Sequence, residues 1–174
     1  MRRKIIMGLA ALAAAIAPAI ATTAPAAAAG GNSGQLKERF GSYSLGMTFP
    51  LTDGNRVFQA SSTNIRPLSF VPDGLTFNGA KTGTLKFGDF DADNDRICAG
   101  APDSHSVIGT ECSGVTGIRW AEVPLGFGHF FYVNVHASSS TDELLTGDNI
   151  QGHQFTLDCR SCHSGDEQQF EWVS

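Results

Sequence analysis

Residues 86–126 read KFGDFDADNDRICAGAPDSHSVIGTECSGVTGIRWAEVPLG, and the rest of the chain can be arranged around them. The stretch holds four aspartates at alternate positions, two of the four cysteines and one of the two tryptophans. Its first part predicts an oxygen-rich loop able to bind a hard cation. Its second part predicts a hairpin closed by a disulfide, followed by an aromatic core residue.

Short segments on both sides of this stretch alternate between apolar and polar residues. Such alternation predicts half-buried strands, and clusters of Gly, Pro, Asn, Asp and Ser between the segments predict turns. The predicted strands cover residues 43–51, 57–60, 75–77, 85–87, 97–99, 107–108, 131–135 and 155–159. Twelve phenylalanines and twenty glycines, without a long helical pattern, indicate an all-β fold, a small single-domain β-barrel.

The chain begins with the features of a secretory signal peptide. Arg2, Arg3 and Lys4 precede an apolar run, and an Ala-x-Ala site ends at Ala29. We therefore predict a signal peptide over residues 1–29, a flexible segment over residues 30–41, a single all-β domain over residues 42–174, and an extracellular location.

The charge of the chain excludes several kinds of partner. The net charge is −5, and removal of the three basic residues of the predicted signal leaves nine basic against seventeen acidic side chains. A mature protein with a net charge of −8 has no electrostatic reason to bind nucleic acid or an anionic membrane. No later run is long and apolar enough to span a bilayer.

The four cysteines of an exported protein predict two disulfides. Three pairings are possible, and we favour the local ones, Cys98 with Cys112 and Cys159 with Cys162. The segment Cys159-Arg160-Ser161-Cys162-His163 also matches the attachment motif of c-type haem, a redox pair or half of a zinc site. The strand predicted to enter it and the oxidising compartment favour a structural disulfide.

Three large aromatic residues recur at a regular spacing. Phe70, Trp120 and Trp172 are 50 and 52 residues apart, and each closes a short predicted strand. Three units of this size, each contributing an aromatic side chain to a common centre, resemble a β-trefoil.

The second unit also resembles a ricin-B-type lectin repeat, in which a hairpin disulfide precedes a Gln-x-Trp motif. Cys98, Cys112, Gly114 and Trp120 occupy the matching places, whereas Ile118 stands where that family has glutamine. The resemblance implies a trefoil fold and a carbohydrate ligand.

The alternating aspartates Asp89, Asp91, Asp93 and Asp95 are the candidate metal ligands. Calcium (Ca²⁺) takes six to eight oxygens from carboxylates and carbonyls, whereas Mg²⁺ prefers to keep its water. Residues 88–102 resemble an FG-GAP calcium loop, with Asn94 in place of its turn glycine. The alternative is a solvated acidic turn without an ion.

Tyr132, Asn134 and His136 are the candidate ligand-binding residues. They alternate with Phe131, Val133 and Val135, so we predict a polar, aromatic face able to stack on and hydrogen-bond a sugar. The alternative is the outer face of an ordinary amphipathic strand.

The motifs of common enzymes are missing, which leans against catalysis. Paired carboxylates for sugar hydrolysis remain open, with the members Glu122, Asp142, Glu143 and Asp166. We predict a secreted, non-catalytic protein that binds an extracellular ligand, with carbohydrate favoured, and that is stabilised by calcium. The alternatives are a protease inhibitor acting through the loop at residues 101–110 and a small extracellular redox or hydrolytic enzyme.

Overall fold

The computed structural model describes residues 32–47, 54–61, 65–90, 96–102, 105–113, 116–137, 143–159 and 165–174. The predicted signal peptide, most of the predicted calcium loop and the segment at residues 160–164 therefore lie outside the described residues.

Twelve strands and one short 3₁₀ helix are present in the described residues, and the strands fall into three groups of four. The first group is β1 (Ser33–Glu38), β2 (Ser44–Met47), β3 (Val57–Ala60) and β4 (Leu68–Phe77). The second is β5 (Ala80–Phe90), β6 (Arg96–Gly100), β7 (Ile108–Glu111) and β8 (Arg119–Gly126). The third is β9 (His129–Asn134), β10 (Glu143–Thr146), β11 (Thr156–Cys159) and β12 (Phe170–Val173), with the 3₁₀ helix η2 (Asp166–Gln168) before β12.

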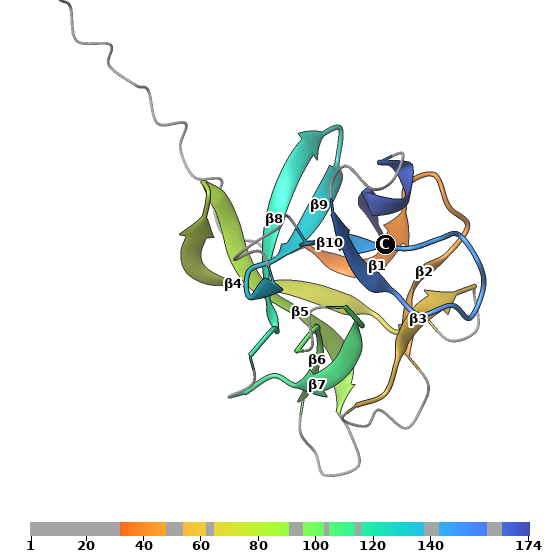
Figure 1. Cartoon of the computed structure of the whole chain (residues 1–174), viewed down its shortest axis with the longest axis horizontal. Helices are drawn as coiled ribbons and strands as arrows, with labels where there is room; N and C mark the ends of the chain where they lie inside the picture. The colour runs from red at the N-terminus through yellow and green to blue at the C-terminus, as the bar shows by residue number, and fades with distance from the viewer. Residues whose placement is uncertain are drawn as a thin grey trace, which may run out of the picture.

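The first and last strands of the three groups close into a six-stranded antiparallel barrel. Its strands pair in the cycle β1–β4–β5–β8–β9–β12 and back to β1. The middle strands of each group form a hairpin, namely β2–β3, β6–β7 and β10–β11. The β2–β3 and β6–β7 hairpins lie at the right and at the bottom of Figure 1, beside the barrel strands. This is the predicted β-trefoil topology.

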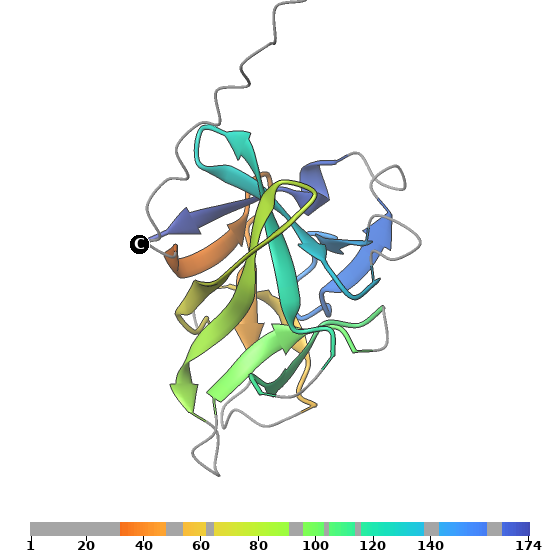
Figure 2. The ribbon, with the colours of Figure 1, turned by 90° about the vertical axis from the view of Figure 1, so that its left-hand side faces the viewer.

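The two ends of the barrel differ. Figure 2 shows the β4–β5 and β8–β9 hairpins reaching one end of the molecule, while β6–β7 lies at the other. No helix in the part of the chain that the structure describes is long and apolar enough to cross a membrane.

A ring of three backbone hydrogen bonds joins the three groups. The Val57 N–H donates to Val107 O (3.1 Å), the Val107 N–H to Phe155 O (3.0 Å), and the Phe155 N–H to Val57 O (2.9 Å). All three residues are fully buried. A second set runs in the opposite direction around the three groups: the Gln59 N–H donates to His153 O, the Gly109 N–H to Asn55 O and the Leu157 N–H to His105 O. Within each set, every group donates to one neighbour and accepts from the other.

The barrel interior is filled by two layers of six side chains, as the strand registers define them. The layer nearer the hairpins consists of Glu38, Leu68, Phe87, Trp120, Asn134 and Phe170. The other layer consists of Leu36, Phe70, Leu85, Glu122, Tyr132 and Trp172. Trp172 is half-buried, and the other eleven are buried. Two glutamates and one asparagine therefore occupy positions where apolar residues would be expected.

The registers also correct the predicted repeat. Phe70 and Trp172 occupy equivalent positions, but the residue at that position in the second group is Glu122. Trp120 instead corresponds to Leu68 and Phe170, which belong to the layer nearer the hairpins, two residues along the strand from the layer of Phe70. Its indole Nε1 donates to Ala99 O at 2.7 Å, so this tryptophan connects the barrel to β6.

The prediction of a flexible segment over residues 30–41 is wrong for Ser33–Glu38, which forms β1. This strand pairs with β12, β2 and β4, and Leu36 is fully buried. Its alternation of Leu36 and Glu38 with Gln35 and Lys37 is a strand pattern in which one inward residue is charged.

The predicted disulfide between Cys98 and Cys112 is confirmed. It joins β6 to the residue after β7, so it closes one of the three hairpins. Cys159, at the end of β11, is also disulfide-bonded. Its predicted partner Cys162 lies outside the described residues, so that pairing stays a prediction.

Candidate functional site

The predicted sugar-binding face on β9 is not formed. Tyr132 and Asn134 are fully buried, and of the three residues only His136 is exposed. The Tyr132 hydroxyl donates to Glu122 Oε1 (2.7 Å) and accepts from the Trp172 indole N–H (2.8 Å). The pKa of Tyr132 is well above its usual value because of burial and of the neighbouring Glu122 carboxylate.

The prediction failed because both faces of β9 are buried. Phe131 and Val133 pack in a small apolar cluster outside the barrel, and the alternate residues point into the barrel. Asn134 is satisfied there by structural hydrogen bonds. Its Nδ2 donates to Gly117 O, and its Oδ1 accepts from the backbone N–H groups of His136 and Ala137.

The predicted calcium ligands fall almost entirely outside the described residues. Asp91, Asp93 and Asp95 are not described, and the backbone of Asp89 lies near the end of β5. Phe90 pairs with Arg96, so the aspartate-rich segment connects two paired ends of β5 and β6. The calcium site stays a prediction.

Two further candidates are placed unfavourably. In the loop proposed for protease inhibition, Ala101 and Val107 are fully buried, and Val107 belongs to the backbone ring. Of the carboxylates considered for sugar hydrolysis, Glu122 lies inside the barrel, where it accepts hydrogen bonds from Asn32 and Tyr132. Asp166 is exposed on η2 and lines a different cavity.

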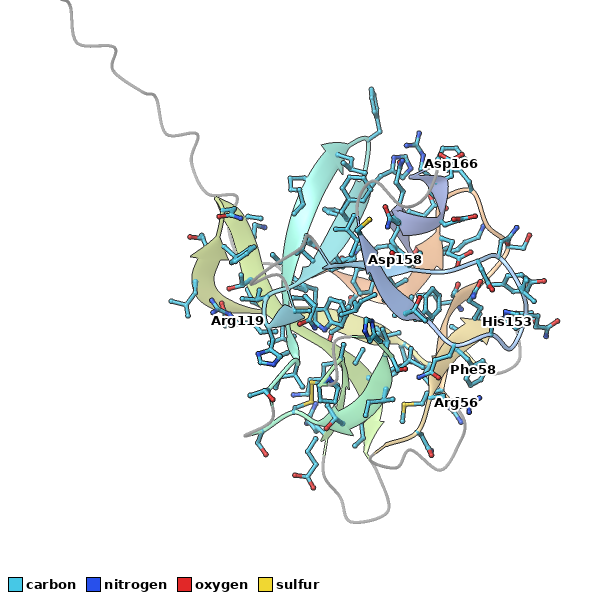
Figure 3. All side chains as sticks on the ribbon, viewed as in Figure 1. Arg56, Phe58, Arg119, His153, Asp158 and Asp166 are labelled. Atoms are coloured by element: carbon cyan, nitrogen blue, oxygen red, sulfur yellow. A yellow bond between two sulfur atoms is a disulfide. The ribbon has the colours of Figure 1, made fainter. Side chains whose placement is uncertain are left out.

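That cavity, hereafter the polar pocket, has a volume of about 220 Å³. It is lined by Glu38, Phe40, Gly41, Asn149, Asp166 and Glu167. These residues come from three places in the chain: the end of β1 with the bend after it, the loop after β10, and η2. In Figure 3, Asp166 on η2 lies on the right-hand side of the molecule, opposite Arg119. His153 lies on the same side and belongs to the loop after β10, as Asn149 does.

Hydrogen bonds donated by backbone N–H groups hold the three segments of the polar pocket together. The Ser42 N–H donates to Asn149 Oδ1 (3.0 Å), which joins the bend after β1 to the loop after β10. The Gly147 N–H donates to Glu167 O (3.0 Å), and the Arg39 N–H to Gln169 O (2.8 Å). The positions of the segments that line the pocket are therefore fixed by hydrogen bonds between them.

Glu38 is the most unusual residue of the polar pocket. Its side chain is 1% exposed, and its Oε1 has no hydrogen-bond partner. A Cβ atom at Gly41 or at Gly147 would collide with the Glu38 carboxyl group, so two glycines make room for it. A buried carboxylate without a partner costs free energy. Burial, and then the charges of Asp148 and Glu167, raise the pKa of Glu38 to about 7.

The rim of the polar pocket combines an aromatic ring with hydrogen-bonding groups. Phe40 is 56% exposed, and the Arg39 guanidinium lies over its ring, 4.5 Å from the centroid. Arg39 Nη1 also donates to Gln169 Oε1 at 2.7 Å. Next to the pocket, burial tends to raise the pKa of Asp148, but hydrogen bonds from His153 and Gln59 outweigh it and lower the pKa below its usual value.

A second cavity, of about 200 Å³, lies between the β4–β5 and β8–β9 hairpins. It is lined by Phe77, Asn78, Ala80, Val123, Phe131, Val133 and Leu144. Ligand sites need a few placed polar groups to orient what they bind. Asn78 supplies the single polar side chain here, so the polar pocket is the better candidate site.

Sequence reasoning missed the polar pocket because its residues are far apart in the chain. The one local signal was Glu38, a charged residue on the same face of β1 as the buried Leu36. Asp166 was considered for a different role.

No model of a protein family matches the chain, and no curated protein matches it. Solved structures do. The designed three-fold symmetric protein ThreeFoil is similar over 82% of this chain and 98% of its own, with 19% identity and a TM-score of 0.59. A Caenorhabditis elegans protein of unknown function is similar over 81% and 92%, with 11% identity and a TM-score of 0.50.

A salivary protein from Culex quiquefasciatus, of the Cysteine and Tryptophan-Rich family, covers 85% of this chain and 98% of its own, with 13% identity and a TM-score of 0.49. The likeness to ThreeFoil supports the trefoil fold that the strand pairing defines.

The raised pKa of Glu38 makes stability depend on pH. The unfolded carboxyl group titrates near 4.5 and the folded one near 7, so the folded state binds the proton more tightly. Stability is therefore greatest below pH 4.5 for this group and falls as the pH rises to 7, by about 3 kcal/mol. Denaturant unfolding at pH 5 and pH 8 measures the fall, which Glu38→Gln should abolish.

Glu111→Gln is the control, because Glu111 is exposed on β7. It should keep the same fall as the unaltered protein. An equal fall in Glu38→Gln would show that another group is responsible. The carboxylates with lowered pKa values, Asp73 and Asp148, titrate below this window.

Proposed function

We propose that this protein is a secreted, non-catalytic binding protein whose ligand is a carbohydrate held in the polar pocket. The observation that carries the proposal is a cavity whose lining includes three carboxyl groups, those of Glu38, Asp166 and Glu167. Sugar hydroxyl groups are hydrogen-bond donors, and the exposed Asp166 carboxylate at this cavity can accept from them.

The other residues of the polar pocket support this ligand class. Asp166 and Glu167 add carboxylate acceptors, and Phe40 offers apolar surface beside them. Aromatic and charged groups at one rim suit the apolar faces and polar edges of a sugar ring. A volume of about 220 Å³ is smaller than the roughly 300–1,000 Å³ of a pocket for a drug-sized ligand, so we expect it to hold one terminal residue of a longer saccharide.

An extracellular location is supported by two independent features. The first 29 residues have the pattern of a cleaved signal peptide. The Cys98–Cys112 disulfide suits an oxidising compartment. A protease is a less favoured partner, because the loop proposed to enter its active site contains the buried Val107.

Sugar binding should depend on the polar pocket alone. Isothermal titration with a panel of neutral and amino mono- and oligosaccharides should find at least one ligand of millimolar or better affinity. Phe40→Ala should weaken its binding about tenfold, because a stacked ring is worth on the order of 1 kcal/mol or more. Phe127→Ala is the matched control, since Phe127 is 99% exposed and does not line the pocket.

Equal loss of affinity in Phe127→Ala would place the ligand elsewhere on the surface. The absence of binding to every saccharide of the panel would contradict the proposed function.

We also propose that calcium binds the segment at Asp89–Asp95. The support is the density of carboxylates in a short connection whose ends, Phe90 and Arg96, are paired. A cation there would offset the mutual repulsion of the aspartates and stabilise the hairpin that begins with β6.

Thermal unfolding with millimolar calcium and with a chelator tests this site. We expect a higher midpoint with calcium, because an ion that binds the folded state stabilises it by mass action. Asp91→Ala should remove the difference, and Asp73→Ala, which alters an aspartate paired with Arg119, should retain it. An unchanged midpoint in the unaltered protein would contradict the site.

A further inference from the structure

We propose that this protein forms a two-fold symmetric dimer in which the Phe127 ring of each copy enters the apolar cavity of the other. The apolar cavity is the one of about 200 Å³ between the β4–β5 and β8–β9 hairpins. Three features support this dimer: the cost of a phenylalanine at the tip of β8–β9, the fit between its ring and the cavity, and the uncharged tips of both hairpins. Dimerisation does not depend on carbohydrate binding in the polar pocket, so each proposal can hold without the other.

Phe127 occupies a backbone position that disfavours bulky residues. Gly126 pairs with His129, so the β8–β9 hairpin turns through the two residues between them, Phe127 and Gly128. Both have positive φ angles, 54° and 80°. A positive φ brings the Cβ of a side chain too close to the backbone, which is why glycine and asparagine are the usual residues there. Phe127 therefore lowers the stability of its own turn.

The β4–β5 hairpin makes the same kind of turn with favoured residues. Its Phe77 pairs with Ala80, and the two residues between them are Asn78, with a φ of 48°, and Gly79, with a φ of 82°. Asn-Gly is the preferred pair in such two-residue turns. The contrast shows that the backbone alone does not call for a phenylalanine at the tip of β8–β9.

The Phe127 ring gains no burial within its own chain. It is 99% exposed, the highest fraction among the large apolar residues that the structure describes. A Cβ atom added at Gly126 or at Gly128 would meet no atom within 4 Å, so the tip of the hairpin projects from the protein. Backbone strain and an exposed apolar side chain at one residue are typical of a site that contacts another molecule.

The apolar cavity suits a phenyl ring in both size and chemistry. An apolar cavity of about 150 Å³ binds benzene, so a cavity of about 200 Å³ has room for the ring of Phe127. Asn78 is the single polar residue among the described residues that line it, and the others are Phe77, Ala80, Val123, Phe131, Val133 and Leu144. Insertion of the ring would remove the apolar surfaces of both the ring and the cavity from water.

The ring and the cavity belong to the same hairpin, and this determines the symmetry of the dimer. Val123 and Phe131 pair with each other on β8 and β9 and line the cavity, while Phe127 lies at the tip between these strands. Figure 2 shows that the β4–β5 and β8–β9 hairpins reach the same end of the molecule. A second copy related by a two-fold axis at this end would insert its own ring in return, so the assembly closes as a dimer.

The hairpin tips carry no charge that would keep two copies apart. Residues 74–80 and 123–128 contain no Asp, Glu, Lys or Arg. Elsewhere two copies repel each other, because each mature chain has a net charge of −8. Contact through the uncharged tips leaves apolar burial as the main interaction. Added salt should therefore strengthen the dimer, because it screens the remaining repulsion.

Sedimentation equilibrium of the mature protein between about 1 µM and about 1 mM tests the dimer, and we expect a monomer–dimer equilibrium in this range. Phe127→Asn should weaken dimerisation about a hundredfold, because two buried rings are lost and each contributes about tenfold or more. The same substitution supplies the residue that the turn prefers, so it should raise the thermal midpoint of the dilute protein. Loss of the dimer is then separated from unfolding.

Ala80→Phe tests the cavity. A ring at this half-buried position fills the cavity from its own chain and should weaken the dimer as much as Phe127→Asn does. Ala80→Leu serves the same purpose with a smaller side chain if Ala80→Phe does not fold. A mixture of Phe127→Asn and Ala80→Phe combines one ring with one open cavity, so it should associate about tenfold more tightly than either variant alone.

Phe40→Ala is the matched control, because it removes another exposed phenylalanine that lines the polar pocket and not the apolar cavity. It should leave the dimer unchanged. A protein that stays monomeric up to about 1 mM would overturn the dimer, and so would unchanged association in Phe127→Asn. No gain in the mixture, or growth beyond a dimer, would contradict reciprocal insertion. A monomer that co-sediments with phosphatidylcholine vesicles through Phe127 would make a bilayer the occupant instead.

Discussion

The fold depends on a closed ring of three backbone hydrogen bonds between Val57, Val107 and Phe155. Each of these residues comes from a different group of four strands, and each both donates and accepts. No set of four strands can provide hydrogen-bond partners for its own residue of the ring, because the N–H and C=O that pair with that residue belong to the two neighbouring sets. Buried N–H and C=O groups without partners are costly, so the three groups stabilise one another only when all are folded.

This constraint acts on the backbone, so it leaves the side chains of the three groups free to differ. Nine of the twelve positions in the barrel interior are apolar or aromatic, and the exceptions are Glu38, Glu122 and Asn134. Glu122 and Asn134 have hydrogen-bond partners inside the protein. Glu38 differs, because one of its oxygens has none and it borders a cavity. An inner barrel position has thus become part of the wall of the polar pocket, at a cost in stability.

The strand pattern was readable from the sequence where alternation was undisturbed, as at Val57–Ala60, which forms β3 as predicted. It misled where a strand begins with small polar residues or points a polar residue inward. Ser33, Gly34 and Gln35 made β1 look like part of a flexible segment, and Asn134 made the inner face of β9 look like an outer one. The aromatic repeat gave the correct fold with an incorrect register, because Trp120 occupies the layer of Leu68 and not that of Phe70.

The polar pocket could not be predicted, since residues 38–41, 149 and 166–167 meet only after the barrel has closed. Closure is therefore the central claim, and hydrogen exchange measures it directly. The amide protons of Val57, Val107 and Phe155 should exchange with one common free energy, equal to that of global unfolding. Markedly faster exchange at one of the three, or three different free energies, would show that the ring opens piecemeal and would contradict this account.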